Sequence, residues 1–157
     1  MRTVLPATYA ANLVTGWLPG LDGVVDKLTA GAVVADVGCG HGASTLLMAE
    51  AFPQSTFRGT DAHGGSIDTA RVRAAQSAAR SRTTFEAADA DAFTGGPYDI
   101  VTMFDCLHDM GDPVGAAKHI RDVIAADGTW VIVEQAGFTR FRLAAQTPFN
   151  NIFEVRP

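Results

Sequence analysis

Three glycines at alternate positions are the clearest chemical signal in the sequence. Gly38, Gly40 and Gly42 follow a short apolar run and precede a segment rich in alanine, leucine and methionine. Glycine is needed where the chain turns through conformations that a Cβ atom forbids, and where a ligand lies against bare backbone. Amide groups at the start of the following helix favour an anionic group. The spacing therefore predicts a nucleotide- or nucleoside-binding loop at residues 36–42.

Carboxylates beside this loop bear on which ligand it holds. Asp36 lies two residues before the first glycine, where it would repel a pyrophosphate and attract the cationic S-adenosylmethionine (SAM). Asp61 ends the next predicted strand and suits the two ribose hydroxyls of NAD or SAM alike. Asp89 and Ala90 follow the third predicted strand, where an adenine edge would lie. Because Ala43 completes a Gly-x-Gly-x-x-Ala fingerprint, an NAD(P)-binding domain stays an alternative.

Apolar runs alternate with helical patterns along most of the chain. Strands are predicted at residues 32–37, 56–60, 83–88, 98–104 and 129–134. Helices are predicted at residues 9–17, 21–28, 44–52, 66–81 with Ser66 as N-cap, and from Pro113 to Asp127-Gly128 with Val114, Ala117, Ile120 and Ile124 on one face. This order predicts an α/β fold, a mostly parallel sheet with helices on both faces, joined by right-handed crossovers.

The composition limits the class of protein. A chain of 157 residues, 47% of them hydrophobic, suits one globular domain spanning residues 1–157. A net charge of −5 disfavours a nucleic-acid partner. The two cysteines, Cys39 and Cys106, match no disulfide or zinc pattern, so we expect no metal site. Without a secretory signal or an apolar run long enough for a bilayer, we expect no membrane association and a cytoplasmic location.

Taken together, the motifs resemble class I SAM-dependent methyltransferases, which have a Rossmann-like, doubly wound fold. The resemblance covers residues 32–134 and keeps the motif order of that family. Residues 34–42 resemble the first motif, 57–61 the second, 88–90 the third, 98–109 the fourth strand with its loop, and 127–134 the fifth strand with its turn.

The resemblance implies SAM as the cofactor and assigns roles to residues. The cofactor-binding residues that it implies are Asp36, Gly38, Cys39, Gly40, Gly42, Asp61, Ala62, Asp89, Ala90 and Asp105. His108 and Asp109, just after the fourth strand, are the candidates for a catalytic base when the acceptor must lose a proton. A hydrogen-bonded loop histidine is the competing interpretation of His108. Methyl transfer from a sulfonium is an in-line displacement, in which positioning supplies much of the catalysis.

Residues 104–113 are similar to a bacterial subgroup of methyltransferases that carry a winged-helix-like segment before the catalytic domain. Here residues 1–31, predicted as helices, precede the core. After the core, residues 135–157 are predicted to contain a C-terminal hairpin, and only residues 135–140 separate Glu134 from Phe141. A parallel return to the sheet needs a crossover of about a dozen residues. We therefore expect a truncated or internally deleted member. Its last segment would pair antiparallel with the fifth strand or pack loosely.

The predicted function is methyl transfer from SAM to a small-molecule acceptor. A small acceptor is favoured by the acidic charge and by the similarity to the bacterial subgroup. A catalytically inactive SAM-binding or interaction module is the alternative from another class, and an NAD(P)-binding domain is the other. A short sheet edge leaves backbone unpaired, and a homodimer is one way to cover it.

Overall fold

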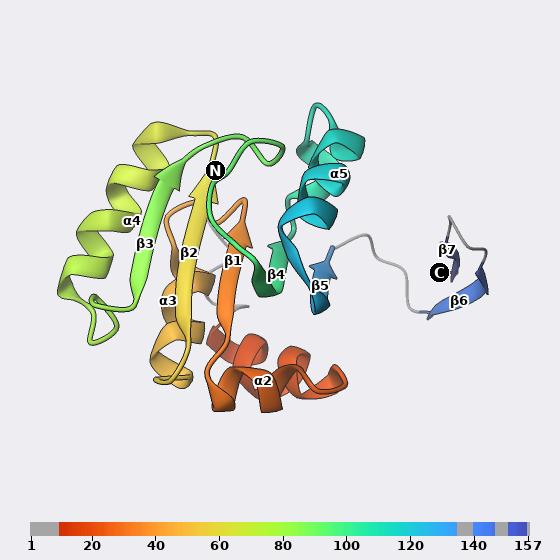
Figure 1. Cartoon of the computed structure of the whole chain (residues 1–157), viewed down its shortest axis with the longest axis horizontal. Coiled ribbons are helices and arrows are strands. Elements are labelled where there is room, and N and C mark those ends of the chain that lie inside the picture. The colour runs from red at the N-terminus through yellow and green to blue at the C-terminus, as the bar shows by residue number, and fades with distance from the viewer. Residues whose placement is uncertain (1–9, 135–139, 147–150, 157) are drawn as a thin grey trace.

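The computed structural model describes residues 10–134, 140–146 and 151–156, and its centre is a sheet of five parallel strands (Figure 1). The strands are β1 (Val33–Val37), β2 (Thr56–Asp61), β3 (Thr83–Ala87), β4 (Tyr98–Phe104) and β5 (Ile124–Val133). They lie in the order β3-β2-β1-β4-β5, so the chain builds outward in both directions from β1. The predicted Rossmann-like parallel sheet is confirmed. Ligands of such sheets bind where the order reverses, at the carboxyl ends of the strands.

Helices cover both faces of this sheet. They are η1 (Leu13–Trp17), η2 (Leu18–Gly20), α2 (Val24–Ala30), α3 (Ala43–Ala51), α4 (Gly64–Gln76), η3 (Leu107–Asp109) and α5 (Pro113–Val123). Alternate residues of β1 enter different cores, as the two-residue period of a strand requires. Val34 packs with residues of α2 and α3, whereas Ala35 and Val37 pack with residues of α5.

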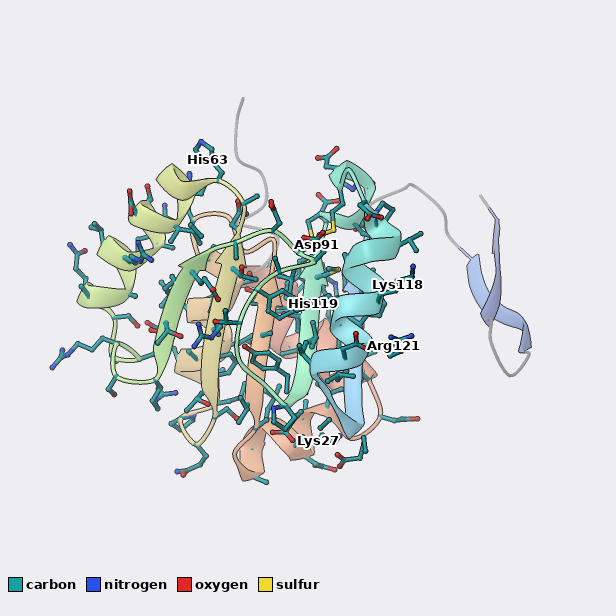
Figure 2. All side chains as sticks on the ribbon, turned by 45° about the horizontal axis from the view of Figure 1, so that its top comes forward. Lys27, His63, Asp91, Lys118, His119 and Arg121 are labelled. Atoms are coloured by element: carbon teal, nitrogen blue, oxygen red, sulfur yellow. The ribbon has the colours of Figure 1, made fainter. Side chains whose placement is uncertain are left out.

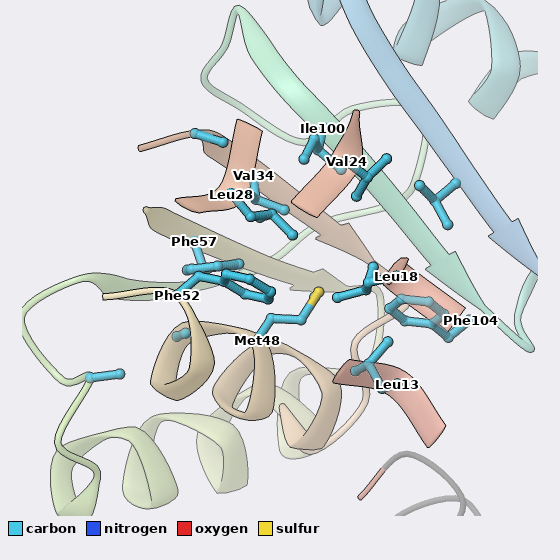
Figure 3. Close-up of a cluster of buried hydrophobic side chains, with 14 residues drawn as sticks. Leu13, Leu18, Val24, Leu28, Val34, Met48, Phe52, Phe57, Ile100 and Phe104 are labelled. Atoms are coloured by element: carbon cyan, nitrogen blue, oxygen red, sulfur yellow. The ribbon is translucent and has the colours of Figure 1, made fainter. Parts of the chain in front are cut away.

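The larger core lies on the face covered by the N-terminal helices and α3 (Figure 3). Its side chains come from β1, β2, β4 and β5 and from four helical segments. The members labelled in the figure are Leu13, Leu18, Val24, Leu28, Val34, Met48, Phe52, Phe57, Ile100 and Phe104. On the same face, α4 packs Ile67 and Ala70 with Phe85 of β3. The opposite face is closed by α5 through Ala116 and Ile120.

The predicted start and end of α4 are wrong. Its N-cap is His63, whose side chain accepts a hydrogen bond from the Ser66 amide, so Ser66 lies inside the first turn. The helix ends at Gln76, because Ser77 is already extended, rather than near Ser81.

The predicted end of α5 is also wrong. Ile124 is extended and pairs with Tyr98, so β5 begins there and the Asp127-Gly128 pair lies within the strand. The register shifts between Tyr98 and Ile100 to accommodate the extra residues. The buried face of α5 is carried by Ala116 and Ile120, whereas Val114 is 61% exposed.

The C-terminal hairpin is a separate sheet. Its strands, β6 (Arg140–Gln146) and β7 (Asn151–Arg156), pair antiparallel with each other, and β6 forms no ladder with β5 among the described strands. The expected antiparallel pairing with the fifth strand is therefore not found. A deletion before the hairpin stays a prediction, and residues 135–139 lie outside the described part. Within that part, no helix has the length and apolar character to cross a bilayer.

Candidate active site

The glycine loop is hydrogen-bonded to the carboxyl end of β2. The amides of Gly38 and Cys39 both donate to the Thr60 carbonyl, at 2.8 and 3.0 Å. Gly38 has φ +73°, and a Cβ atom there would come within 2.7 Å of the Cys106 sulfur. Both the backbone conformation and this close approach require glycine at position 38. The loop therefore connects the ends of β1, β2 and β4 at one point.

Asp61 joins the glycine loop to the turn that follows β2. Its Oδ2 accepts the Gly40 amide at 2.9 Å, and its Oδ1 accepts the His63 amide at 2.8 Å. A carboxylate oxygen has two lone-pair sites, so each oxygen keeps one for a further donor. The side chain also lines the cavity described next. It is thus a rigid acceptor for a pair of hydroxyl groups.

A cavity of about 450 Å³ opens at the carboxyl edge of the sheet. Its lining comes from the ends of β1, β2 and β4, the loop after β3, and the segment before α5. The lining residues are Val37, Gly38, Asp61, Ala62, Ala88, Asp89, Ala90, Asp91, Cys106, Asp109, Met110, Gly111 and Asp112. Of the predicted site residues, Gly38, Asp61, Ala62, Asp89, Ala90 and Asp109 are in this lining, and Asp36, Cys39, Gly40, Gly42, Asp105 and His108 are not.

Asp36 is only 1% exposed and points into the core beneath α3. Its carboxylate accepts three hydroxyl hydrogen bonds, from Ser44 and Thr45 of α3 and from Thr102 of β4, at 2.6 to 2.8 Å. Burial raises its pKa, and the three hydroxyl groups partly offset that shift. A direct contact with a cofactor stays a prediction. The observed partners make Asp36 a tie between β1, β4 and the helix after the glycine loop.

Both cysteines lie close to the glycine loop, and both are free thiols. Burial raises the pKa of Cys106 to about 12, with the Asp36 carboxylate as the next cause. Burial raises the pKa of Cys39 as well, again helped by Asp36. Because the thiolate is the reactive form, these shifts disfavour a role for Cys39 and Cys106 as reactive thiols and favour a role as small packing residues.

Glu134, directly after β5, organises the segment that carries the candidate base. Its Oε1 accepts the amides of Cys106 and Leu107, at 3.2 and 2.7 Å. Its Oε2 lies 2.6 Å from Nδ1 of His108. From the sequence, Glu134 was predicted only as the end of a strand and had no assigned role. The signal in the sequence was a carboxylate at that strand end, and the adjacency of β4 and β5 that brings it to His108 came from the structure.

His108 lies between two acidic partners. The hydrogen bond with Glu134 is the main cause that raises its pKa, and the charges of Asp109, Glu134 and Asp105 add to the shift. Its Nε2 is 3.3 Å from Oδ2 of Asp109. Ligand atoms of Asp105, His108 and Glu134 lie within 4.8 Å of one another, close enough to hold a metal ion. Glu134, however, already accepts two backbone amides and the imidazole, which favours an oriented base over a metal ligand set.

Comparison with known protein families identifies the family to which this chain belongs. Residues 35–130 match the family model described as a methyltransferase domain. The chain belongs to the methyltransferase domain family. It is therefore assigned to the class I SAM-dependent methyltransferases, and the family match favours this class over an NAD(P)-binding domain. SAM is the cofactor of that class.

One relative is a named methyltransferase, and two solved structures of lower identity share the fold. Trans-aconitate 2-methyltransferase of Streptomyces avermitilis is 38% identical over 99 residues, which are 62% of this chain and 37% of that enzyme. An O-methyltransferase from a polyketide synthase of Brevibacillus brevis, solved with S-adenosylhomocysteine (SAH), has a TM-score of 0.62 at 21% identity, covering 65% of this chain and 35% of that one. The cyclase SpnF has a TM-score of 0.64 at 24% identity, covering 72% and 44%. The chain thus spans about a third of the first relatives' length.

Proposed function

We propose that this chain binds SAM in the carboxyl-edge cavity and transfers its methyl group to a small-molecule acceptor. The observation that carries the proposal is Asp61, a carboxylate that lines the cavity while it holds the glycine loop through the Gly40 amide. Such an acceptor suits two ribose hydroxyls. Ala62, Asp89 and Ala90 line the same cavity and would lie along the adenine. The methionyl end would then point toward Gly38 and Cys106.

Catalysis would combine positioning with a base. SAM supplies an activated methyl group, so alignment of the acceptor supplies much of the rate. When the acceptor loses a proton, His108 is the group to take it: Glu134 holds Nδ1, and Nε2, which lies 3.3 Å from Oδ2 of Asp109, would accept the proton with that carboxylate beside the resulting charge. Cys106 and Asp109, which flank His108 in the chain, both line the cavity, and this supports a role for His108 near the acceptor end.

Calorimetric titration with SAM and SAH tests the cofactor site. Wild-type protein should bind both, and Asp61→Asn should bind both more weakly, with Glu50→Gln as a control distant from the cavity lining. Turnover should follow as SAH release from SAM in the presence of an acceptor. Failure of correctly folded wild-type protein to bind either ligand would contradict the proposal.

The charge of the cavity indicates the class of acceptor. Five carboxylates line it, and none of its described lining residues is lysine, arginine or histidine; the acidic members are Asp61, Asp89, Asp91, Asp109 and Asp112. A polycarboxylate such as trans-aconitate, the substrate named for one relative, would find no cationic partner there. We expect neutral or cationic acceptors to be methylated in preference to anionic ones of similar size. Equal or faster methylation of the anionic acceptors would contradict this expectation.

A SAM-binding module without turnover is the second candidate. It is favoured by the hairpin of β6 and β7, which forms its own sheet instead of extending the central one. A neighbour in fold is a named cyclase, so the fold alone does not decide the reaction. SAH binding without SAH release on a broad acceptor panel would support this candidate.

The outer edge of β5 has no strand partner among the described residues, and we propose that a homodimer forms through this edge. Sedimentation would detect the dimer.

A further inference from the structure

The imidazole of His63 forms the N-cap of α4. Its Nδ1 lies 3.1 Å from the Ser66 amide nitrogen and 3.0 Å from the Ser66 hydroxyl. An amide N–H can only donate, so Nδ1 must present a lone pair and the ring proton must be on Nε2. The cap therefore requires a neutral imidazole. Serine, threonine, aspartate and asparagine, the usual capping residues, accept this hydrogen bond without titrating near neutral pH.

The backbone of the same residue holds the proposed ribose acceptor. The His63 amide donates to Oδ1 of Asp61, and the Gly40 amide donates to Oδ2. Ser66, His63, Asp61 and Gly40 thus form one continuous chain of hydrogen bonds, from the first turn of α4 to the glycine loop. Ala62, between the two ends of this turn, lines the cavity. Figure 2 shows His63 at the start of α4, on the same edge of the sheet as Asp91, another lining residue.

We propose that His63 is a positioning residue for the cofactor, whose neutral imidazole keeps Asp61 in place and whose protonation weakens SAM binding at mildly acidic pH. The inference rests on the proposed cofactor site. His63 acts through Asp61 and through the turn that carries Ala62, and it is not placed in the cavity lining.

Protonation disrupts the cap in two ways. A proton on Nδ1 faces the Ser66 amide donor, so that hydrogen bond is lost and the ring keeps only the Ser66 hydroxyl as an acceptor. A positive charge at a helix N-terminus is also unfavourable, because the aligned peptide dipoles make that end positive. Both effects weaken the first turn of α4, which then keeps only the backbone bonds from the Ser66 and Ile67 amides to the His63 carbonyl. The turn from Asp61 to His63 is held less firmly as a result.

The effect of His63 on the pH dependence of binding must be distinguished from the effects of other titratable groups on the adjoining elements. They are His41 in the glycine loop, Asp61 at the end of β2, Asp89 after β3, and Asp68 of α4, which pairs with Arg71. The carboxylates ordinarily titrate below about pH 5, so a range of about pH 5.5 to 8 isolates the histidines. Within this range, His41 and His108, whose pKa is raised by its hydrogen bond with Glu134, are the competing sources of a pH effect; a pH dependence that comes from either of them would persist in His63→Asn.

The test is calorimetric binding of SAM and of SAH across that pH range. Wild-type affinity for both ligands should fall with decreasing pH, by up to about fivefold, the effect expected for loss of one helix cap. His63→Asn keeps a capping acceptor that does not titrate, so its affinity should match wild type at about pH 8 and stay constant. His63→Ala should bind weakly at every pH. His41→Asn should keep the wild-type pH dependence.

The outcomes separate this inference from the cofactor assignment. A wild-type protein that binds neither ligand at about pH 8 would overturn both. Binding that keeps its pH dependence in His63→Asn, or loses it in His41→Asn, would overturn only the role of His63. A fall in affinity for SAM but not for SAH would also overturn it, because repulsion of the sulfonium charge, and not loss of the cap, would then be the cause.

Discussion

Asp36 and Asp61 show how two carboxylates at the same edge of a sheet acquire different functions. Asp36 has its oxygens occupied by hydroxyl groups in the core, whereas Asp61 has free acceptor sites in the cavity. The difference follows from the strand period. Asp36 shares the face of β1 that α3 covers, whereas Asp61 is the last residue of β2 and lines the cavity.

Asp61→Asn should therefore reduce affinity for SAH more than Asp36→Asn. The Asp61 variant replaces an ionised acceptor with an amide and weakens its hold on Gly40. Hydrogen bonds to charged groups are the strong ones, so we expect a loss of about tenfold or more. Asp36→Asn should change SAH affinity by less, since its partners are the hydroxyls of α3 and β4. Calorimetry at neutral pH measures the SAH affinity of both variants. A larger loss in Asp36→Asn would support the direct contact between Asp36 and the cofactor that is expected from the sequence.

The pH dependence of methyl transfer should report on His108 and Glu134. A base acts in its neutral form, so the rate should rise with pH through the pKa of His108, which the Glu134 hydrogen bond and the nearby carboxylates raise above its ordinary value. Glu134→Gln removes one of these charges and the acceptor that orients Nδ1. Its profile should shift to lower pH, and its plateau rate should fall.

The measurement is the rate of SAH release against pH, on any acceptor found to be methylated. His108→Asn should lose about a hundredfold in kcat and lose the pH-dependent limb, whereas the KM for SAM should change little. A Glu134→Gln profile that coincides with wild type would show that His108 is a loop histidine and not the base.

At the scale of elements, single side chains decide where helices end. Arg82, just before β3, donates from Nη1 to the carbonyls of Ala49, Phe52 and Ser55. These carbonyls lie at and beyond the end of α3, where a helix leaves acceptors unpaired. Arg82 thus joins the end of α3 to the start of β3, and α3 in turn begins at the glycine loop.

Arg82→Ala should lower the free energy of unfolding by about 1–3 kcal/mol, because it leaves those carbonyls without a charged donor. Arg80→Ala, two residues earlier and exposed, is the matched control and should change stability by less than about 0.5 kcal/mol. Urea unfolding monitored by tryptophan fluorescence measures both. Equal effects of the two substitutions would contradict the capping role of Arg82.

At the scale of the whole molecule, the cavity lining that the structure describes comes from the part of the chain that forms the five-stranded sheet. Its lining ends at Asp112, and the two main cores draw their residues from positions before Glu134. The hairpin of β6 and β7 pairs within itself. The described lining of the proposed cofactor site and the hairpin are thus formed by different residues.

Removal of residues 135–157 should therefore leave SAH affinity within about twofold of the full chain, given that no lining residue is lost. The thermal midpoint should also shift little. Calorimetry and thermal unfolding of the shortened chain check this, with the full chain as control. Loss of SAH binding in a shortened chain that still folds would show that the hairpin contributes to the site.

Local chemistry in the sequence was enough to predict the alternation of strands and helices, the glycine loop, and Asp61 at the end of the second strand. Apolar runs and glycine positions report on conformations within a few residues, and the motif order identified the family. Strand β4 was predicted at the observed residues, and the parallel sheet followed from the order of elements. The N-cap of α4 was missed because histidine is not among the usual capping residues, although its ring accepts the Ser66 amide.

Only the tertiary structure decided which polar side chains meet. Glu134 and His108 are 26 positions apart, and their 2.6 Å contact exists because β4 and β5 are neighbours with their carboxyl ends level. Asp36 could be placed in the core only when Thr102 and the first turn of α3 were in position around it. The end of α5 was decided by the pairing of Ile124 with Tyr98. In each case the deciding interaction joins residues distant in sequence, whose meeting depends on the assembled sheet.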